Sequence, residues 1–391
     1  MTLATATIAE RVQQLVDDFA QTASARDKAG GTAKRERDLL RQSGLLSALF
    51  SESSNKGSVD WQQVLDITRT LARVDSSLAH LFGYHYLCVA TVDLYGSNEQ
   101  LKHLIAQTKA ANAFWGNAFN PLDQHVTATK TNGGWLVNGT KHFCSGASDS
   151  DYLLLSAHVQ TNDYPLIAVI PTKTTGVEVL DDWDSFGQRQ TDSGSVTFTD
   201  VFVNEAQALQ KHHHSEHYLY ATCRTHIAQS ILLHVLLGTA EGAFDAAKAY
   251  TKQSTRPWVT ANVTDATEDP YIIRHYGELY VQLQAADALL ERAVTTLVDT
   301  LALKHNMTFE QRGACSIAIA TAKIQVVNTT LDVTSKMFQL MGARATSAQY
   351  NFDRYWRNVR THTLHDPIDY KIRDVGQFAL HDRYPQISAY S

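Results

Sequence analysis

The sequence predicts an α+β protein in which a helical block, a β block and a second helical block follow one another. Apolar residues recur at helical spacing from Ile8 to about Lys109, and longer runs with the same period fill the last part of the chain. Between them lie short segments rich in β-branched and aromatic residues. We therefore expect three domains: an N-terminal helical domain at 1–114, a central β domain at 115–210 and a C-terminal helical bundle at 211–391.

The first helical block has apolar residues every three or four positions from Ile8 to Phe19, the period of a helix with one buried face. Gly30-Gly31 and the small polar residues of 51–58 interrupt this period and indicate loops. Asp75-Ser76-Ser77 offers several N-capping side chains. A further helix is therefore expected to begin there and to continue through LAHLFGYHYLCVATVDLYG.

The central block begins near Trp115 and contains short runs with the composition of strands. These runs are 126–131, 135–137, 152–159, 166–170, 176–180 and 195–203. Asn132-Gly133 and Asn138-Gly139 are strong tight-turn signals. Strands at such close spacing, without helices between them, favour a small barrel or sandwich over repeated βαβ units.

The last block contains three long segments with helical period. The first, Ile227 to Lys252, should end at Arg256-Pro257, because the residue before a proline disfavours helical geometry. The other two, Tyr271 to Leu303 and Phe309 to Gly342, are each long enough to cross a whole domain. Long helices joined by short turns predict an antiparallel bundle.

Composition and charge exclude several classes of partner. The formal net charge is −6 and the pI is near 6.3, so no basic field is present to hold nucleic acid or an anionic membrane. No stretch approaches eighteen consecutive apolar residues, and the N-terminus lacks the pattern of a signal peptide, so we expect no membrane span. The four cysteines, Cys88, Cys144, Cys223 and Cys315, form no CxxC pair, which fits a reducing cytoplasm.

The motifs of several large enzyme classes are absent from the sequence. It contains no GxGxxG after a strand, no P-loop, no HExxH and no GxSxG, so a Rossmann enzyme, a P-loop NTPase and an α/β-hydrolase are poorly supported. The segment 211–217 (KHHHSEH) could bind a metal, but adjacent histidines between two structural blocks are more typical of a solvated loop. We therefore predict no metal site.

Several longer strings occur in the order found in one flavoprotein family. They are HLFGYH (80–85), GTKHFCSGA (139–147), DDW (181–183), QTDSGS (190–195), RPW (256–258), TEDPY (267–271), GAR (342–344) and WRNVRTHTLHDP (356–367). With these strings the chain resembles the acyl-CoA dehydrogenase superfamily, and most closely its flavin-dependent monooxygenase branch, typified by dibenzothiophene monooxygenase. The resemblance implies an acyl-CoA-dehydrogenase-like fold with a central small β-barrel and a C-terminal four-helix bundle, assembled as a homotetramer.

The same resemblance implies a two-component enzyme. A separate flavin reductase would supply reduced FMN, and its reaction with O2 would give a flavin C4a-hydroperoxide. One oxygen atom would then pass to a small apolar organosulfur substrate, as in the S-oxidation of a dibenzothiophene-like compound. Such a site must exclude water and must place hydrogen-bond donors at the flavin N5 edge.

Three other functions remain open at the level of the sequence. Dehydrogenases of the superfamily commonly carry a glutamate base in an I-Y-E-G-T segment, where this chain has Thr363-Leu364-His365-Asp366-Pro367. Asp366 is one methylene shorter, which weakens but does not exclude proton abstraction by an FAD-dependent acyl-CoA dehydrogenase. N-oxygenation of an amine and a non-enzymatic flavin-binding role are the second and third functions. The presence of the candidate polar site residues disfavours the non-enzymatic role.

The candidate catalytic residues are His80, Tyr84, Ser145 and His365. His80 and Tyr84 lie four positions apart on the predicted helix and share a face, and the resemblance places them at the reactive edge of the isoalloxazine. The alternative for His80 is a packed core histidine. The resemblance places the Ser145 hydroxyl near flavin N5, whereas a turn serine would bond its own backbone. It also makes His365 a second proton-handling residue.

The candidate cofactor-binding residues are Asn117, Ser145, Trp183, Arg256, Arg344, His362 and Asp366. Arg256 and Arg344 are candidates for binding the FMN phosphate, because a planar guanidinium can donate two parallel hydrogen bonds to phosphate oxygens. The alternative for Arg344 is a helix-end arginine that offsets the dipole. Trp183 could flank the ring system or be an ordinary core tryptophan.

Overall fold

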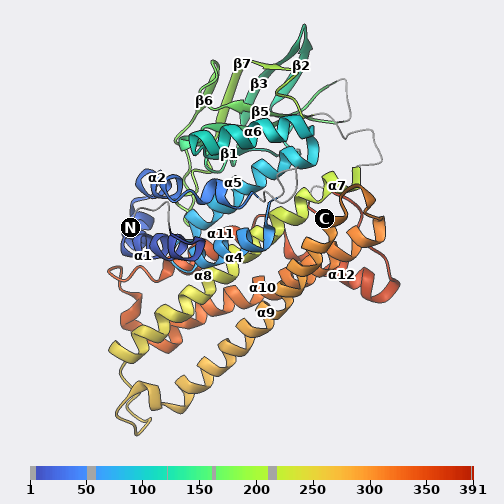
Figure 1. Cartoon of the computed structure of the whole chain (residues 1–391). Helices are drawn as coiled ribbons and strands as arrows, with labels where there is room; N and C mark the ends of the chain where they lie inside the picture. Colours follow the sequence, from blue (N-terminus) through green and yellow to red (C-terminus); the bar gives the residue numbers. More distant parts are fainter. Residues whose placement is uncertain (1–5, 51–58, 121, 161–163, 210–217, 389) are drawn as a thin grey trace.

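The computed structural model describes residues 6–50, 59–120, 122–160, 164–209, 218–388 and 390–391. Three parts are visible in Figure 1: strands at the top, the N-terminal helices in the middle and long C-terminal helices that cross the lower half. This is the α+β order that the sequence predicts. The histidine-rich segment 211–217 and the loop predicted at 51–58 lie outside the described residues.

In the described part of the chain, six helices precede the first strand. They are α1 (Ile8–Ala29), α2 (Lys34–Gln42), α3 (Leu45–Ala48), α4 (Trp61–Ala72), α5 (Ser76–Tyr95) and α6 (Asn98–Ala111). The predicted start of α5 is confirmed, because the Asp75 side chain accepts a hydrogen bond from the Leu78 backbone N–H and caps the helix. Almost every side chain of α5 is buried, so this helix is enclosed on all sides.

Among the described residues, seven strands form two small sheets. They are β1 (Trp115–Ala118), β2 (Thr127–Thr131), β3 (Gly134–Lys141), β4 (Tyr152–Ala157), β5 (Leu166–Pro171), β6 (Val177–Val179) and β7 (Val196–Asn204). The strand order is β1-β4-β5 in one sheet and β2-β3-β7-β6 in the other. Single bridges, Thr127 with His158 and Ala168 with Ala208, link sheet residues to the connecting segments, and both sheets contribute to one apolar core.

One local feature of the sheets differs from the sequence prediction, and one feature was not predicted. Asn132-Gly133 does form the turn between β2 and β3, with Gly133 at φ 77°. Asn138-Gly139 does not form a turn: both residues lie inside β3, where Gly139 (φ 119°) marks a register shift against β7. A glycine inside a strand often signals such a bulge. In addition, β1 and β4 pair in parallel, although the described residues between them form a hairpin and no crossover α-helix.

The remaining helices form the C-terminal part. They are α7 (Tyr218–Thr222), α8 (Arg224–Ser254), α9 (Pro270–Leu303), α10 (Phe309–Met341), α11 (Asp353–Thr363) and α12 (Ile368–His381). The long helices α8, α9 and α10 lie side by side across the molecule (Figure 1). α11 packs on α8 and α10, and α12 packs on α10. The three long helices begin and end within a few residues of the predicted bounds.

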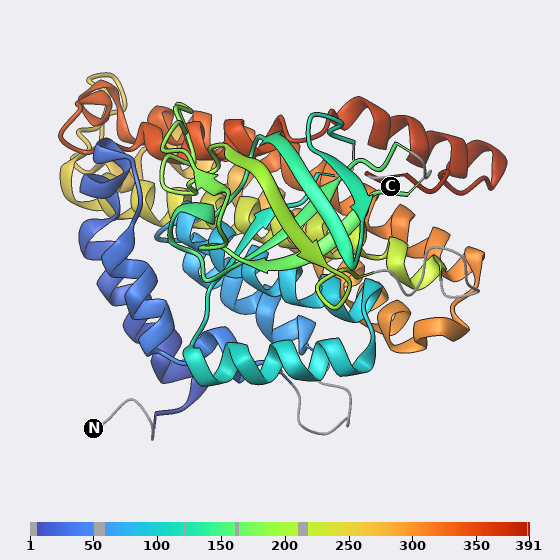
Figure 2. The same cartoon turned by 90° about the horizontal axis from the view of Figure 1, so that it is seen from above.

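Helix α5 is the point where the three parts meet. It contacts α4, α8 and strand β1. The view from above in Figure 2 shows the strands lying over the helices. One continuous apolar cluster includes side chains from both helical parts, for example Leu81 of α5 and Ile231 of α8. Polar residues on α5 therefore lie between the sheets and the bundle.

Two helical stretches, Leu219–Ser254 and Phe309–Met341, are long and apolar enough to cross a membrane by length and composition. However, 83% and 56% of their most apolar windows are buried inside the protein. Core helices of a bundle pass the same test, so these two stretches are weak evidence for a membrane.

Candidate active site

A stripe of polar and aromatic side chains runs along one face of α5. His80, Tyr84, Cys88 and Thr91 follow each other at intervals of three or four residues, which places them on one side of the helix. The His80 ring stacks on Tyr84 with 4.1 Å between ring centroids. The ring of His362 in α11 also contacts the His80 ring, with 5.0 Å between the two ring centroids and the rings tilted. The structure thus brings together His80, Tyr84 and His362.

Burial keeps the two imidazoles of this cluster uncharged. Desolvation lowers the pKa of His80 to about 3, and the charge of nearby His365 lowers it further. Burial together with His80 and His365 likewise lowers the pKa of His362 well below its ordinary value. A neutral imidazole offers one N–H donor and one acceptor. Neither ring nitrogen of His80 has a hydrogen-bond partner, although the residue is buried.

A buried ion pair lies next to the histidines. The Lys323 ammonium of α10 and the Nε2 of Gln229, at 3.2 Å, both donate to Asp366 Oδ1. His365 Nδ1 donates to the same oxygen at 3.1 Å. Burial raises the pKa of the Asp366 carboxyl, but the hydrogen bond from His365 and the charge of Lys323 outweigh this and hold it far below its usual range. The second oxygen, Oδ2, is buried and unpartnered.

A chain of hydroxyl groups forms the β-domain side of the site. The Ser145 hydroxyl shares a hydrogen bond of 2.8 Å with Ser193, which is bonded in turn to the Thr191 hydroxyl at 2.7 Å. The backbone N–H of Asn117 in β1 donates to the Ser145 carbonyl at 2.9 Å. A Cβ on the neighbouring Gly116 would lie 2.9 Å from the Ser150 Oγ, so the strand passes this loop too closely for any larger residue.

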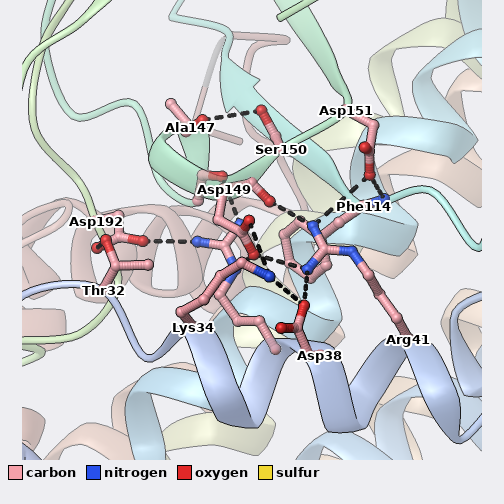
Figure 3. Close-up of polar contacts among 12 residues, drawn as sticks. Thr32, Lys34, Asp38, Arg41, Phe114, Ala147, Asp149, Ser150, Asp151 and Asp192 are labelled. Carbon is pink, nitrogen blue, oxygen red and sulfur yellow. Dashed lines mark hydrogen bonds and ion pairs between the residues drawn. The ribbon is translucent and has the colours of Figure 1, made fainter.

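A buried cluster of ion pairs ties both ends of that hydroxyl chain to α2. Arg37 is fully buried and donates to Asp192 Oδ2 at 2.6 Å and to the Gly146 carbonyl at 2.8 Å. Figure 3 shows Asp192 beside Thr32, and Arg41 between Asp149 and Asp151. Sequence reasoning missed Arg37, because its partners are more than a hundred positions away and no local pattern marks them.

Trp183 lies at the edge of this region and is linked to the histidines through Gln188. Its indole N–H donates to the Gln188 carbonyl at 2.8 Å, and its ring meets Phe143 edge-on. The Gln188 amide donates to His362 Nδ1 at 3.3 Å and to the Ser76 hydroxyl at 2.5 Å. Trp183 is half-buried, so part of its surface is available to another molecule.

Within one chain, Arg256 and Arg344 lie far from the other candidate site residues. Both are exposed, and Arg344 donates to the carbonyl of Ser254, the last residue of α8. Gln229, which contacts the Asp366 carboxylate, lies near the start of the same helix. A rise of about 1.5 Å per residue puts roughly 38 Å between these two points of α8.

One further polar residue of this region was not predicted. Arg224, the first residue of α8, donates from Nε to the Thr91 hydroxyl at 2.9 Å and from Nη2 to Asn117 Oδ1 at 3.2 Å. Its guanidinium lies 3.8 Å over the centre of the Phe119 ring. Helix N-termini usually favour anionic side chains, so a cation at this position is unfavourable for the helix itself. An arginine at the predicted start of a helix is therefore a feature of the sequence that could have pointed to this residue.

The residues present suit a flavin. The unpartnered nitrogens of His80 and the unpartnered Oδ2 of Asp366 are buried polar atoms, and such groups normally have partners in a folded protein. A flavin has polar groups along the edge of its ring system, and the Asn117 and Ser145 side chains next to this cluster can hydrogen-bond such groups. His80, Asn117 and Ser145 would therefore face the ring system, with His362 and Asp366 beside them.

Comparison with known proteins identifies the family of the chain. Residues 231–370 match the model of the acyl-CoA dehydrogenase C-terminal domain, and residues 118–201 match that of the middle domain. A protein of Pseudomonas putida described as a probable FMNH2-dependent monooxygenase, SfnC, is 44% identical over 97% of this chain and 96% of its own length.

Two solved structures are similar over almost the whole chain. MsuC of Pseudomonas fluorescens, a methanesulfinate monooxygenase, has a TM-score of 0.94 at 43% identity, covering 99% of this chain and 100% of its own. FMN-bound TdsC of Paenibacillus sp. A11-2, a dibenzothiophene monooxygenase, has a TM-score of 0.92 at 41% identity, covering 98% and 99%. At this identity and coverage, the chain belongs to the flavin-dependent monooxygenase branch of the acyl-CoA dehydrogenase family.

Proposed function

We propose that the protein is a two-component, FMNH2-dependent monooxygenase that transfers one oxygen atom from O2 to the sulfur of a small organosulfur compound. The observation that carries this proposal is the cluster in which His80, with both nitrogens unpartnered, stacks on Tyr84 and lies against the tilted ring of His362. The relatives named as FMN-dependent or FMN-bound support the choice of cofactor. The second oxygen atom leaves as water, and the reduced flavin supplies two electrons.

Each residue of the cluster has a role that its geometry supports. Ser145 and Asn117 would hold the polar edge of the ring system, with Ser145 oriented by the Ser193 hydroxyl. His80, neutral and without another partner, is free to donate one hydrogen bond to a reacting oxygen. His365 is partly exposed and bonded to Asp366, so it can pass a proton between solvent and the buried site.

The state of Asp366 argues against an FAD-dependent acyl-CoA dehydrogenase. A base that abstracts a proton next to a thioester works best with a pKa near the working pH. The Asp366 carboxyl is instead held at a very low pKa by His365 and Lys323, which makes it a weak base. Oxygenation at nitrogen finds no comparable support, because the similar solved proteins named for a substrate act on sulfur compounds.

The proposal extends to partners and location. A separate flavin reductase delivers reduced FMN, O2 is the co-substrate, and the enzyme works in the cytoplasm, which fits four free cysteines. We also propose a homotetramer. Because Arg256 and Arg344 lie roughly 38 Å along α8 from the Asp366 region, they can hold an FMN phosphate at this site only if they come from a neighbouring copy.

Single-turnover assays test the catalytic assignments. Purified protein is mixed with reduced FMN and air in the presence of methyl phenyl sulfide, and sulfoxide and released H2O2 are measured. His80→Phe and His365→Phe should lower sulfoxide yield by on the order of 100-fold, the scale of lost acid–base help, while FMN affinity stays nearly unchanged. His275→Phe, on the outer face of α9, is the matched control. Unchanged sulfoxide yield in both variants, or no oxygenated product from the native enzyme, would contradict the proposal.

A further inference from the structure

Gln188 is a buried polar residue beside the histidines, and the chemistry proposed above gives it no role. Its backbone carbonyl accepts hydrogen bonds from the Trp183 indole at 2.8 Å and from the Thr191 hydroxyl at 2.9 Å. Its backbone N–H donates to Oδ1 of Asn358 in α11 at 2.7 Å. These contacts hold Gln188 in a left-handed conformation, with φ 54°, which a residue with a side chain keeps only where its surroundings fix it.

The side-chain amide of Gln188 connects the two helices that carry His80 and His362. Its Nε2 donates to the hydroxyl of Ser76 in α5 at 2.5 Å and to Nδ1 of His362 in α11 at 3.3 Å. Ser76 lies one helical turn before His80 and on the same face of α5. The amide therefore links the two helices at the point where the rings of His80 and His362 meet.

A third contact determines which end of the amide faces His362. Nε2 of Gln188 also lies 3.4 Å from the backbone carbonyl oxygen of Asn358. A carbonyl oxygen can only accept a hydrogen bond, so this end of the amide must carry the N–H groups and not the amide oxygen. The amide oxygen is buried at the other end, where no described residue donates to it. Nδ1 of His362 therefore faces a donor.

This contact decides which nitrogen of His362 carries the proton. Burial, together with the charges of His80 and His365, lowers the pKa of His362 well below its ordinary value, so the ring is neutral and has one N–H. Because Nδ1 accepts from Gln188, the proton is on Nε2. Within the described part of the chain, Gln188 is the one hydrogen-bond partner of this ring. Nε2 is therefore left as a donor for a bound molecule.

We propose that Gln188 is a positioning residue, which keeps the proton of His362 on Nε2 so that this ring presents a donor to an oxygen atom that reacts beside His80. The proposal rests on the proposed function, in which His362 lies next to the ring system. The opposite tautomer would present a lone pair at the same place, and a lone pair cannot stabilise a reacting oxygen on which negative charge develops. A side-chain amide does not titrate, so it remains a donor at every pH at which the protein is folded.

The tautomer of His362 can be measured in the flavin-free protein, without any turnover. Histidine is labelled with the heavy nitrogen isotope, and NMR spectra at neutral pH distinguish the protonated from the unprotonated nitrogen of each ring. His362→Gln identifies the signals of this residue. The native protein should show His362 with its proton on Nε2. In Gln188→Met, which fills similar space without a donor, the two nitrogen signals should move toward each other as the Nδ1–H form becomes populated.

Gln190→Met is the matched control for this substitution. Gln190 is a buried amide of the same loop, but it bonds Arg26 and the Gly30 carbonyl instead of a site histidine. Its His362 signals should be those of the native protein. In single turnover with reduced FMN, air and methyl phenyl sulfide, Gln188→Met should give less sulfoxide and more H2O2. The change should be on the order of 10-fold, the scale of one hydrogen bond, and Gln190→Met should behave like the native protein.

A native His362 with its proton on Nδ1 would overturn the inference, and this result needs no variant that folds. Unchanged His362 signals in Gln188→Met would also overturn it, as would changed signals with an unchanged yield of sulfoxide. Each of these results leaves the oxygenase standing if the native protein forms sulfoxide. A tautomer that depends on Gln188, in a native protein that gives no oxygenated product, would instead contradict the proposed function and leave the effect of Gln188 on His362 intact.

Discussion

Lys323 and Asp366 form an ion pair in which both side chains are only 6% exposed. Removing one partner of such a pair leaves a buried, uncompensated charge, which typically costs about 3–5 kcal/mol. Lys323→Met should therefore lower the free energy of unfolding by about that amount, measured by urea denaturation at neutral pH. The loss should be larger than for an exposed lysine such as Lys336, whose pairing with Asp332 lies at the surface.

The double variant Lys323→Met with Asp366→Asn serves as the control. It replaces both charges, so it should recover much of the stability that the single variant loses. Equal stability of the single and the double variant would mean that Asp366 becomes protonated or hydrated at little cost when Lys323 is removed.

Some of the individual residues of the candidate site could be predicted from the sequence. His80, Tyr84 and His362, and Asp366 with His365, belong to strings that resemble one family, and the structure brings them together. Lys323 and Arg224 were missed, because their site partners lie 43 and 107 positions away in the chain. A single buried cation produces no periodic pattern in the sequence, so it can be recognised only from its contacts in the folded protein.

At the scale of elements, α4 and α8 approach each other through two glycines of α8. A Cβ on Gly238 would lie 2.3 Å from the Arg69 carbonyl oxygen, and one on Gly242 would lie 2.0 Å from that of Arg73. Backbone cannot move aside as a flexible side chain can. Gly238→Ala and Gly242→Ala should therefore each push the helices apart and cost about 1–3 kcal/mol, the range found for overpacked cores.

A matched glycine on a neighbouring helix provides the comparison. Gly277 of α9 has nothing within 4 Å of the position of an added Cβ, so Gly277→Ala should stabilise the helix by up to about 1 kcal/mol. Thermal unfolding of the three variants measures the contrast. Similar melting temperatures for Gly242→Ala and Gly277→Ala would show that α4 and α8 can separate freely.

The order and bounds of most elements could be predicted from the sequence, but their partners could not. Periodicity is a local property, so the long helices α8, α9 and α10 were found to within a few residues. The parallel pairing of β1 with β4 joins segments separated by a hairpin, and nothing in either segment specifies it. The Asn138-Gly139 signal was wrong because Gly139 serves a bulge within β3.

At the scale of the whole molecule, the central position of α5 and α8 buries an unusual set of histidines. Burial lowers the pKa of His80 to about 3 and the pKa values of His85 and His234 to about 4. The pKa values of His226 and His362 also lie well below the ordinary value. These five side chains stay neutral in the folded protein where the same side chains in the unfolded chain become charged.

This difference predicts a protein that is sensitive to mild acid. Well above pH 6.5 neither state binds protons at these histidines, so their effect on stability is constant. As the pH falls below 6.5, the unfolded chain takes up protons that the folded protein excludes, and each histidine costs about 1.4 kcal/mol per pH unit until the pH approaches its folded pKa. Five such groups can remove a large share of a typical stability of about 5–15 kcal/mol.

Denaturant unfolding at pH 7.5, 6.5 and 5.5 measures the effect. Stability should fall in the first interval, where the unfolded histidines begin to take up protons, and fall more steeply in the second, where carboxylates are ionised in both states and contribute little. His234→Gln removes one titrating group outside the candidate site. In that variant the slope of stability against pH should be smaller by the contribution of about one bound proton, or about 1.4 kcal/mol per pH unit. If the stability did not change down to pH 5.5, the folded protein would have to bind protons at these histidines. That result would also contradict the neutral state proposed for His80.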